Sequence, residues 1–256
     1  MTTDHPVLIR NDDRLLWITI NRPTSANALS GEVRAGLWRA FEQVRDDPGV
    51  GAAILTGSGT RAFCAGGDLK EMSQSGLAIP PPDFLPHLGR NIDTDKPVIA
   101  AVNGRALGGG FLLAQMADLC IAAEHATFGI TEARWGRGFP WANPLLDLVP
   151  RRVAVEMMMT GQPISAARAY EIGLVNQVVA VADLLDAAHS MARTILANAP
   201  LTVRAAKQMV RRFGRHAYED SFDAADEIFR PVYLSADAHE GPAAFRERRT
   251  PRWTSA

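Results

Sequence analysis

Two glycine-rich segments of the sequence have the composition of turns that hold an oxygen atom through backbone N–H groups. The first runs from Phe63 to Met72 (FCAGGDLKEM) and the second from Asn103 to Gly110 (NGRALGGG). Each follows an apolar run and precedes a predicted helix, and in the first segment Asp68 and Glu71 have the spacing of a capping box. Two N–H groups that converge on one oxygen form an oxyanion hole, in which a single donor typically stabilises a transition state by ~3–4 kcal/mol.

These glycines also have a simpler interpretation, in which they only allow tight turns and close packing. Neither segment matches G-x-G-x-x-G or G-x-x-x-x-G-K-[ST], so the common phosphate-binding loops are excluded. Taken singly, each segment fits the structural role better. A catalytic role requires that the fold bring the two segments together.

Other chemistry-bearing residues form weaker patterns. Cys64 lies in an apolar strand without a histidine placed as its partner, so a buried thiol is favoured over a nucleophile. The six histidines form no H-x-x-x-H pair or mixed ligand cluster, and no metal is expected. Glu132 ends the segment FGITE, where it can serve as an acid/base group or as the start of a helix. Asp118 opens a strand directly after a helix and is expected to be structural.

Strands that alternate with helices must position these residues. A helix capped by Ser30 carries apolar residues at helical spacing. The alternation predicts an α/β core. Strands are expected at 7–10, 15–20, 52–55, 97–102 and 119–122, with a turn at 11–13.

After residue 150 the pattern becomes helical. Helices are expected at 165–172 and 182–197, and three more after Pro200. Pro231 is expected to end the second of these three, and Ser235 to cap the last. The second contains an apolar stripe that either core packing or a subunit interface would explain, formed by Tyr218, Phe222, Ala225 and Phe229.

Composition predicts a soluble globular protein. Of 256 residues 47% are hydrophobic, and 27 Lys and Arg nearly balance 28 Asp and Glu, which argues against disorder and against a general nucleic-acid binder. The most apolar region, 98–123, is interrupted by Asn103, Arg105 and Asp118, so no membrane span is expected. The N-terminus lacks a signal-peptide pattern and the two cysteines form no C-x-x-C motif, which favours a cytoplasmic protein with reduced thiols.

The two glycine-rich segments, together with Asp118-Leu119, resemble the signature segments of the crotonase, or enoyl-CoA hydratase/isomerase, superfamily. The resemblance spans nearly the whole chain in the family's order. Further matching segments are Asn21-Arg22-Pro23, Asn27-Ala28-Leu29, Thr160-Gly161, Ile164-Ser165-Ala166, Gly173-Leu174-Val175, Ser235-Ala236-Asp237, Glu240-Gly241 and Ala244-Phe245.

The resemblance implies a fold, an assembly and a substrate class. The fold would be a spiral of ββα units over residues 1–198, followed by a helical oligomerisation region over residues 199–256. This region would assemble the chain into a homotrimer or a dimer of trimers. The substrate would be an acyl-CoA thioester, with coenzyme A as part of the substrate and no separate cofactor.

The resemblance also implies roles for particular residues. The N–H groups of Gly67 and Gly109 would form the oxyanion hole. The acyl pocket would depend on the loop from Gly76 to Leu88, so the acyl-chain length is not predicted. Lys70 and Arg22 match phosphate contacts, although solvated surface charges explain them equally well. The adenine and pantetheine parts of CoA would lie against Ala26, Ala65, Gly66, Asp68 and Leu69.

The family's two catalytic glutamates distinguish its activities. Hydratases usually carry one glutamate two residues after the triple glycine, where this chain has Leu112, and the second matches Glu132. One carboxylate suffices to move a double bond from the 3- to the 2-position, whereas hydration divides its proton transfers between two. The resemblance therefore favours an enoyl-CoA isomerase, with a hydratase of fatty-acid β-oxidation as the alternative. Glu71 or Asp147 would supply a second carboxylate if the fold brought either one inward.

The surroundings of Glu132 bear on its strength as a base. Trp135, Phe139 and Trp141 are expected to form an apolar wall that raises the pKa of Glu132 by desolvation. A non-catalytic CoA-binding or RNA-binding relative is a further alternative. The near-neutral charge argues against RNA and the retained Glu132 against an inactive site.

Overall fold

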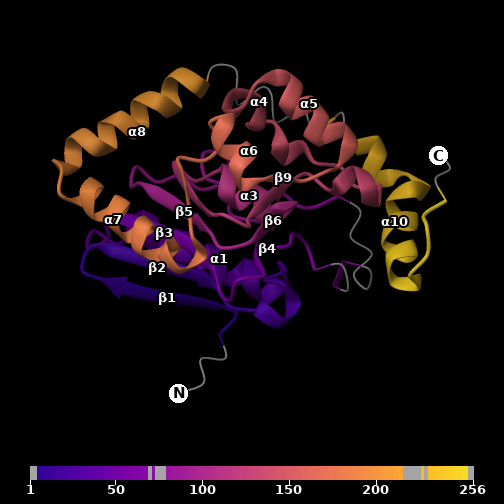
Figure 1. The fold of residues 1–256 in the computed structure, drawn as a ribbon, viewed down its shortest axis with the longest axis horizontal. Helices are drawn as coiled ribbons and strands as arrows, with labels where there is room; N and C mark the ends of the chain where they lie inside the picture. The colour runs from indigo at the N-terminus through magenta and orange to yellow at the C-terminus, as the bar shows by residue number, and fades with distance from the viewer. Residues whose placement is uncertain (1–4, 69–70, 73–78, 216–225, 228–229, 253–256) are drawn as a thin grey trace.

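In the computed structural model the strands form two sheets, each ordered as the chain is (Figure 1). The structure describes residues 5–68, 71–72, 79–215, 226–227 and 230–252. The six-stranded sheet contains β1 (Val7–Asp12), β2 (Leu15–Ile20), β3 (Ala52–Gly57), β5 (Val98–Val102), β7 (Leu119–Ala123) and β10 (Gln177–Val179). The four-stranded sheet contains β4 (Ala62–Cys64), β6 (Arg105–Leu107), β8 (Thr127–Gly129) and β9 (Ile164–Ser165).

Successive strands alternate between the two sheets. β3, β5 and β7 enter the large sheet, and the strand that follows each of them, β4, β6 or β8, enters the small one. Pairing is parallel throughout, except for β1 with β2 and β8 with β9. The expected α/β fold is confirmed, and this alternation is the spiral that the family resemblance implies.

The inner strands of the large sheet, β2, β3, β5 and β7, are buried on both faces, as their nearly uninterrupted apolar sequences require. On one face Ile54 packs with Leu184 and Ala188 of α7 (Leu184–Leu196). On the other, its neighbour Leu55 belongs to a larger core with α1 (Gly31–Asp46) and the small sheet. Because side chains alternate along a strand, one run of apolar residues joins two separate cores.

The remaining helices surround this framework. α3 (Gly109–Gln115) follows β6, and α8 and α10 lie on opposite sides of the molecule (Figure 1). None of the helices described here is long and apolar enough to cross a membrane. The others are α4 (Leu145–Leu148), α5 (Arg151–Thr160), α6 (Ala166–Glu171), α8 (Pro200–Arg215), α10 (Ala236–Glu247) and the 3-10 turns η1 (Pro23–Ser25), η2 (Glu132–Trp135), η3 (Pro140–Ala142) and η4 (Val181–Asp183).

Local predictions are tested at several ends of elements. The side chains of Ser30 and Ser235 accept the expected capping hydrogen bonds from Val33 and Ala238. The predicted turn at 11–13 is wrong in part, because β1 continues to residue 12 and pairs with β2. Pro231 does not end a helix, since residues 230–234 are helical. All four residues of the apolar stripe at 218–229 lie outside the described part of the chain.

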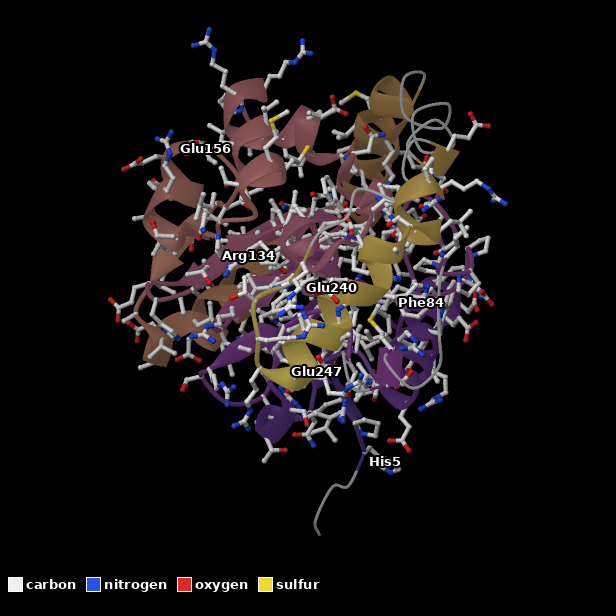
Figure 2. The ribbon with its side chains drawn as sticks, turned by 90° about the vertical axis from the view of Figure 1, so that its right-hand side faces the viewer. His5, Phe84, Arg134, Glu156, Glu240 and Glu247 are labelled. Atoms are coloured by element: carbon white, nitrogen blue, oxygen red, sulfur yellow. The ribbon has the colours of Figure 1, made fainter. Side chains whose placement is uncertain are left out.

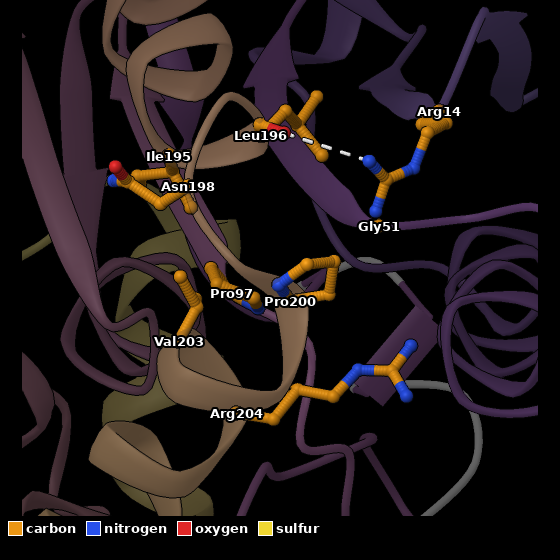
Figure 3. Close-up of a pocket in the computed structure, with 9 residues that line it drawn as sticks. All are labelled: Arg14, Gly51, Pro97, Ile195, Leu196, Asn198, Pro200, Val203 and Arg204. Atoms are coloured by element: carbon orange, nitrogen blue, oxygen red, sulfur yellow. Dashed lines mark hydrogen bonds between the residues drawn. The ribbon is translucent and has the colours of Figure 1, made fainter.

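A small cavity lies where α7 gives way to α8 (Figure 3). Its volume is about 10 Å³, which is less than an organic ligand needs. Arg14 closes one side by donating a hydrogen bond of 3.5 Å to the carbonyl oxygen of Leu196. This cavity is therefore a packing gap and not a ligand site, and none of the residues that line it belongs to the glycine-rich turns.

Candidate active site

The chemistry-bearing segments leave three adjacent parallel strands at the same edge. β4 pairs with β6 through Cys64 and Ala106, and β6 pairs with β8 through Leu107 and Gly129. The first glycine turn, the second glycine turn and Glu132 therefore follow the carboxyl ends of β4, β6 and β8 in that order. This edge is where α/β proteins generally build their binding sites.

The two glycine turns lie in contact. A β-carbon on Gly66 would stand 3.5 Å from the backbone nitrogen of Gly109. Gly66 has a φ of +93° and Gly108 a φ of +54°, conformations that residues with a side chain rarely adopt. A side chain on Gly110 would overlap the carbonyl group of Cys64, so this glycine is needed for close packing of α3 on β4. The structural interpretation of the glycines therefore holds at Gly66, Gly108 and Gly110.

Gly67 and Gly109 lie in apolar surroundings. A β-carbon on Gly67 would stand 2.7 Å from the sulfur of Met72, and one on Gly109 would stand 2.7 Å from Cδ1 of Leu29 and 3.3 Å from Cδ1 of Leu85. Within the described residues, neither backbone N–H donates a hydrogen bond. An oxyanion-binding pair requires such donors in a site of low polarity, and its assignment to these glycines stays a prediction.

Glu132 begins η2 and turns its carboxyl group toward the second glycine turn. Its Oε1 lies 3.0 Å from the position of a β-carbon on Gly108. The Trp141 side chain and the backbone at Thr131 and Glu132 favour the ionised form of this carboxyl group and lower its pKa. Its Oε2 is buried and has no hydrogen-bond partner among the described residues, although Glu132 as a whole is partly exposed.

Burial raises the pKa of Glu132 to about 8. The hydrogen bonds to the carboxylate and the positive charge of Arg137 oppose this shift and are outweighed. The direction is the one predicted from the sequence. A carboxyl group of this kind takes up a proton more readily than an ordinary glutamate and still ionises near neutral pH.

The expected apolar wall is only partly assembled around Glu132. Trp141 contacts the Glu132 carboxyl and packs edge-on against Phe111, with ring centroids 6.4 Å apart. Phe139 packs against the larger core. The ring of Trp135 lies against Phe245 of α10, with centroids 5.1 Å apart.

A second carboxylate does not reach the site from the two expected sources. Leu112 is 4% exposed and belongs to the core. Asp147 is exposed on α4. Glu71 accepts hydrogen bonds from the backbone N–H of Gly31 (2.8 Å) and from Arg34 (2.7 Å).

The capping box predicted at Asp68 and Glu71 is half formed. The Glu71 N–H donates to the Asp68 side chain, while the Glu71 carboxylate binds Gly31 and Arg34 instead of the Asp68 N–H.

The residues expected to contact CoA lie together where they are described. Arg22 pairs with Asp68 at 3.0 Å, and the N–H of Ala65 donates to the carbonyl of Ala26 at 3.1 Å. Ala26 adopts a left-handed conformation at φ +51°, which shapes the turn after η1. Leu69 and Lys70 lie outside the described residues.

Sequence reasoning missed two neighbours of the site. Leu85 is buried against Gly109, and Arg137 is buried close to Glu132. Leu85 lies in the loop from Gly76 to Leu88, which was expected to shape the acyl pocket. The sequence did not indicate which residue of that loop would face Gly109. Nothing in the local pattern distinguishes Arg137 from the exposed Arg134 on the same turn.

Nucleophilic and metal chemistry receive little support. Cys64 is buried in β4, and burial raises the pKa of its thiol to about 12, so it stays protonated at neutral pH. Within the described residues, no group of three or more His, Cys, Asp or Glu side chains is arranged to hold a metal ion.

Comparison with known proteins relates this geometry to a family. A sequence profile described as enoyl-CoA hydratase/isomerase matches residues 10–256. A carnitinyl-CoA dehydratase of Salmonella arizonae is 40% identical over 250 residues, which cover 93% of this chain and 94% of the relative.

Solved structures give the same result. A carnitinyl-CoA hydratase from Mycobacterium avium is 36% identical and superposes with a TM-score of 0.89, over 99% of this chain and all of the other. An enoyl-CoA hydratase from Mycobacterium tuberculosis is 40% identical with a TM-score of 0.76, over 99% of this chain and all of the other.

Proposed function

Because the chain belongs to the enoyl-CoA hydratase/isomerase family, whose members act on acyl-CoA thioesters, we propose that it isomerises 3-enoyl-CoA to 2-enoyl-CoA. Glu132 is the single acid/base group of this reaction, and the N–H groups of Gly67 and Gly109 hold the thioester oxygen.

In this mechanism the thioester oxygen lies between the two glycine turns. Glu132 takes a proton from the α-carbon, and the electron pair of the broken C–H bond delocalises to the oxygen, which becomes an enolate. The enolate re-forms its carbonyl, the double bond moves to the 2-position, and the proton on Glu132 passes to the γ-carbon. A pKa of about 8 suits both steps, because the same group must accept and return a proton near neutral pH.

One observation carries the proposal: the carboxyl group against the second glycine turn belongs to Glu132, while the family's other glutamate position holds the buried Leu112. Isomerisation needs no second carboxylate, since one base can serve the α- and γ-carbons in turn.

Hydration and dehydration form the second candidate. The names of the relatives favour it, because they are carnitinyl-CoA dehydratase, carnitinyl-CoA hydratase and enoyl-CoA hydratase. With Leu112 in place, Glu132 would then have to handle the proton at the α-carbon without a carboxylate partner to orient the water.

The deciding experiment presents purified protein with a 3-enoyl-CoA and, separately, a 2-enoyl-CoA. Isomerisation leaves the mass unchanged and raises the absorbance of the conjugated thioester, whereas hydration adds one water and lowers that absorbance. Faster conversion of the 3-enoyl-CoA supports the isomerase. Hydration of the 2-enoyl-CoA far above the isomerisation rate replaces the first candidate with the second.

We also propose that the helical region assembles the chain into a trimer or a dimer of trimers. Arg204 and Lys207 of α8 (Pro200–Arg215) face the rest of the chain, where they pair with Asp95 and Asp118 at 3.8 and 2.6 Å. Its exposed apolar residues are Leu201 (79%), Met209 (55%) and Val210 (69%). Such a face is typical of a covered surface, and light scattering of the purified protein tests for these assemblies.

A further inference from the structure

The segment that carries Glu132 is tied to the C-terminal helical region. The hydroxyl of Tyr233 donates a 2.8 Å hydrogen bond to the carbonyl oxygen of Gly138. A side chain on Gly241 would overlap the backbone of Trp135, so α10 packs directly on η2. In Figure 2, α10 crosses the front of the molecule with Glu240 and Glu247 on it, and Arg134 of η2 is labelled beside it.

Arg137 stands between these two parts of the chain. Its backbone N–H donates to the carbonyl oxygen of Glu132 at 3.0 Å, which closes the turn after Gly136. Its side chain is buried, and the guanidinium carbon lies 5.0 Å from the centroid of the Tyr233 ring. An arginine over an aromatic face is stabilised by the electrons of the ring and is restricted in direction.

Among the residues that the structure describes, few charged groups act on Glu132. Arg137 is the cation that lowers the pKa of Glu132 from the same turn, and Tyr233 faces both from the helical region. Asp226 and Arg90 pair with each other and act on Tyr233 with opposite signs. α3 contributes the apolar Leu112, and the Trp141 side chain contributes a hydrogen-bond donor. Arg137 is therefore the positive charge that favours the ionised form of Glu132.

We propose that Arg137, held by the ring of Tyr233, is a positioning residue that favours the ionised form of Glu132 and orients its carboxyl group for proton abstraction. The inference rests on the proposed role of Glu132 as the base. The proposal makes the C-terminal helical region part of the catalytic apparatus. Tyr233 belongs to that region, and its ring holds the Arg137 guanidinium, whose charge acts on Glu132 in the spiral core.

The experiment separates this inference from the proposed function by observing Glu132 directly. The carboxyl band of Glu132 is isolated as the infrared difference between the wild type and Glu132→Gln, and is followed against pH. Arg137→Gln should raise the midpoint by about one pH unit, as expected on removal of a nearby opposite charge. Arg137→Lys retains the charge and should keep the midpoint near that of the wild type while lowering kcat, because it loses the planar stacking.

Two further variants complete the test. Arg134→Gln changes an exposed arginine on the same turn and should leave both midpoint and kcat unchanged. If Arg137→Gln does not fold, Tyr233→Leu removes the ring and should raise the midpoint in its place. An unchanged midpoint in a folded Arg137→Gln or Tyr233→Leu protein overturns the inference. This result is readable even if the wild type converts neither enoyl-CoA, an outcome that would reject the proposed function alone.

Discussion

Oε1 of Glu132 lies 3.0 Å from the point where a β-carbon on Gly108 would stand. The carboxyl group that follows β8 thus occupies the space that the glycine after β6 leaves open. A larger residue at position 108 would displace the carboxyl as well as strain a backbone at φ +54°. The glycine therefore shapes the base as well as the turn.

Glu132→Gln should reduce turnover to below about a hundredth of the wild-type rate, because glutamine retains the shape but accepts no proton. Binding of an acyl-CoA should survive, as measured by calorimetry with a non-reactive saturated acyl-CoA. Retention of more than about a tenth of the activity would assign the base to another residue.

Proline at position 109 tests the oxyanion donor. Because Leu29 lies where a side chain on Gly109 would stand, the comparison is best made in a Leu29→Ala background. Gly109→Pro in that background should lower kcat at least ~100-fold relative to Leu29→Ala alone, through loss of one N–H donor. Circular dichroism checks the fold, and a folded double variant with the activity of the single one would refute the assignment.

Leu112→Glu tests whether the missing carboxylate limits hydration. The ratio of 2-enoyl-CoA hydration to 3-enoyl-CoA isomerisation should rise, with Leu112→Gln as the uncharged control. Burial opposes the effect, since it raises the pKa of the new carboxyl and costs about a few kcal/mol of stability. Thermal melts are therefore recorded alongside both rates. Equal ratios in the glutamate and glutamine variants would contradict the role of the charge.

Trp141→Phe should raise the pKa of Glu132, because the side-chain hydrogen bond from Trp141 favours the carboxylate. The acid limb of kcat/KM should move to higher pH, while the ring contact with Phe111 is largely kept. Trp38→Phe is the matched control, since Trp38 donates to the carbonyl of Asp83 away from the site. Identical pH profiles for the two variants would show that the bond to Glu132 has no effect.

The raised pKa of Glu132 also predicts how stability depends on pH. The folded protein holds this proton up to about pH 8, whereas the ordinary value is 4.5. The unfolded chain releases the proton first, so the contribution of Glu132 to the free energy of unfolding is lost as pH rises between these values. Glu132→Gln does not titrate and should become more stable than the wild type by on the order of a few kcal/mol above about pH 8.

Urea unfolding of both proteins at about pH 5 and about pH 9 measures this gap. A constant difference between the two proteins would mean that Glu132 ionises in the folded state as it does in water.

Much of the site follows from the sequence because it depends on local patterns. The glycine turns, Glu132 and the missing carboxylate at Leu112 are positions in short motifs, and the caps at Ser30 and Ser235 need only neighbouring residues. The contact between the turns was not derivable from spacing, since it arises from the pairing of β4 with β6.

Long-range contacts account for what was missed. Arg137 and Tyr233 are 96 positions apart in the sequence and meet only because α10 and the residues before it pack on η2. Glu71 is a local prediction that a long-range contact overrides. Its spacing to Asp68 predicts a reciprocal cap, but its carboxylate instead accepts hydrogen bonds from Arg34 and from the N–H of Gly31. Pro231 failed as a stop because helical residues continue past it.

The order of strands in the two sheets has a consequence for biosynthesis. Since both sheets add strands in the sequence of the chain, each grows at a single edge as the polypeptide leaves the ribosome. At the growing edge β5 covers the exposed side of β3, and β7 that of β5. A pause in translation after β3, β5 or β7 has left the ribosome, and before the next strand of the sheet has emerged, would leave that strand without its neighbour. Chaperone binding to stalled chains should peak at these stages.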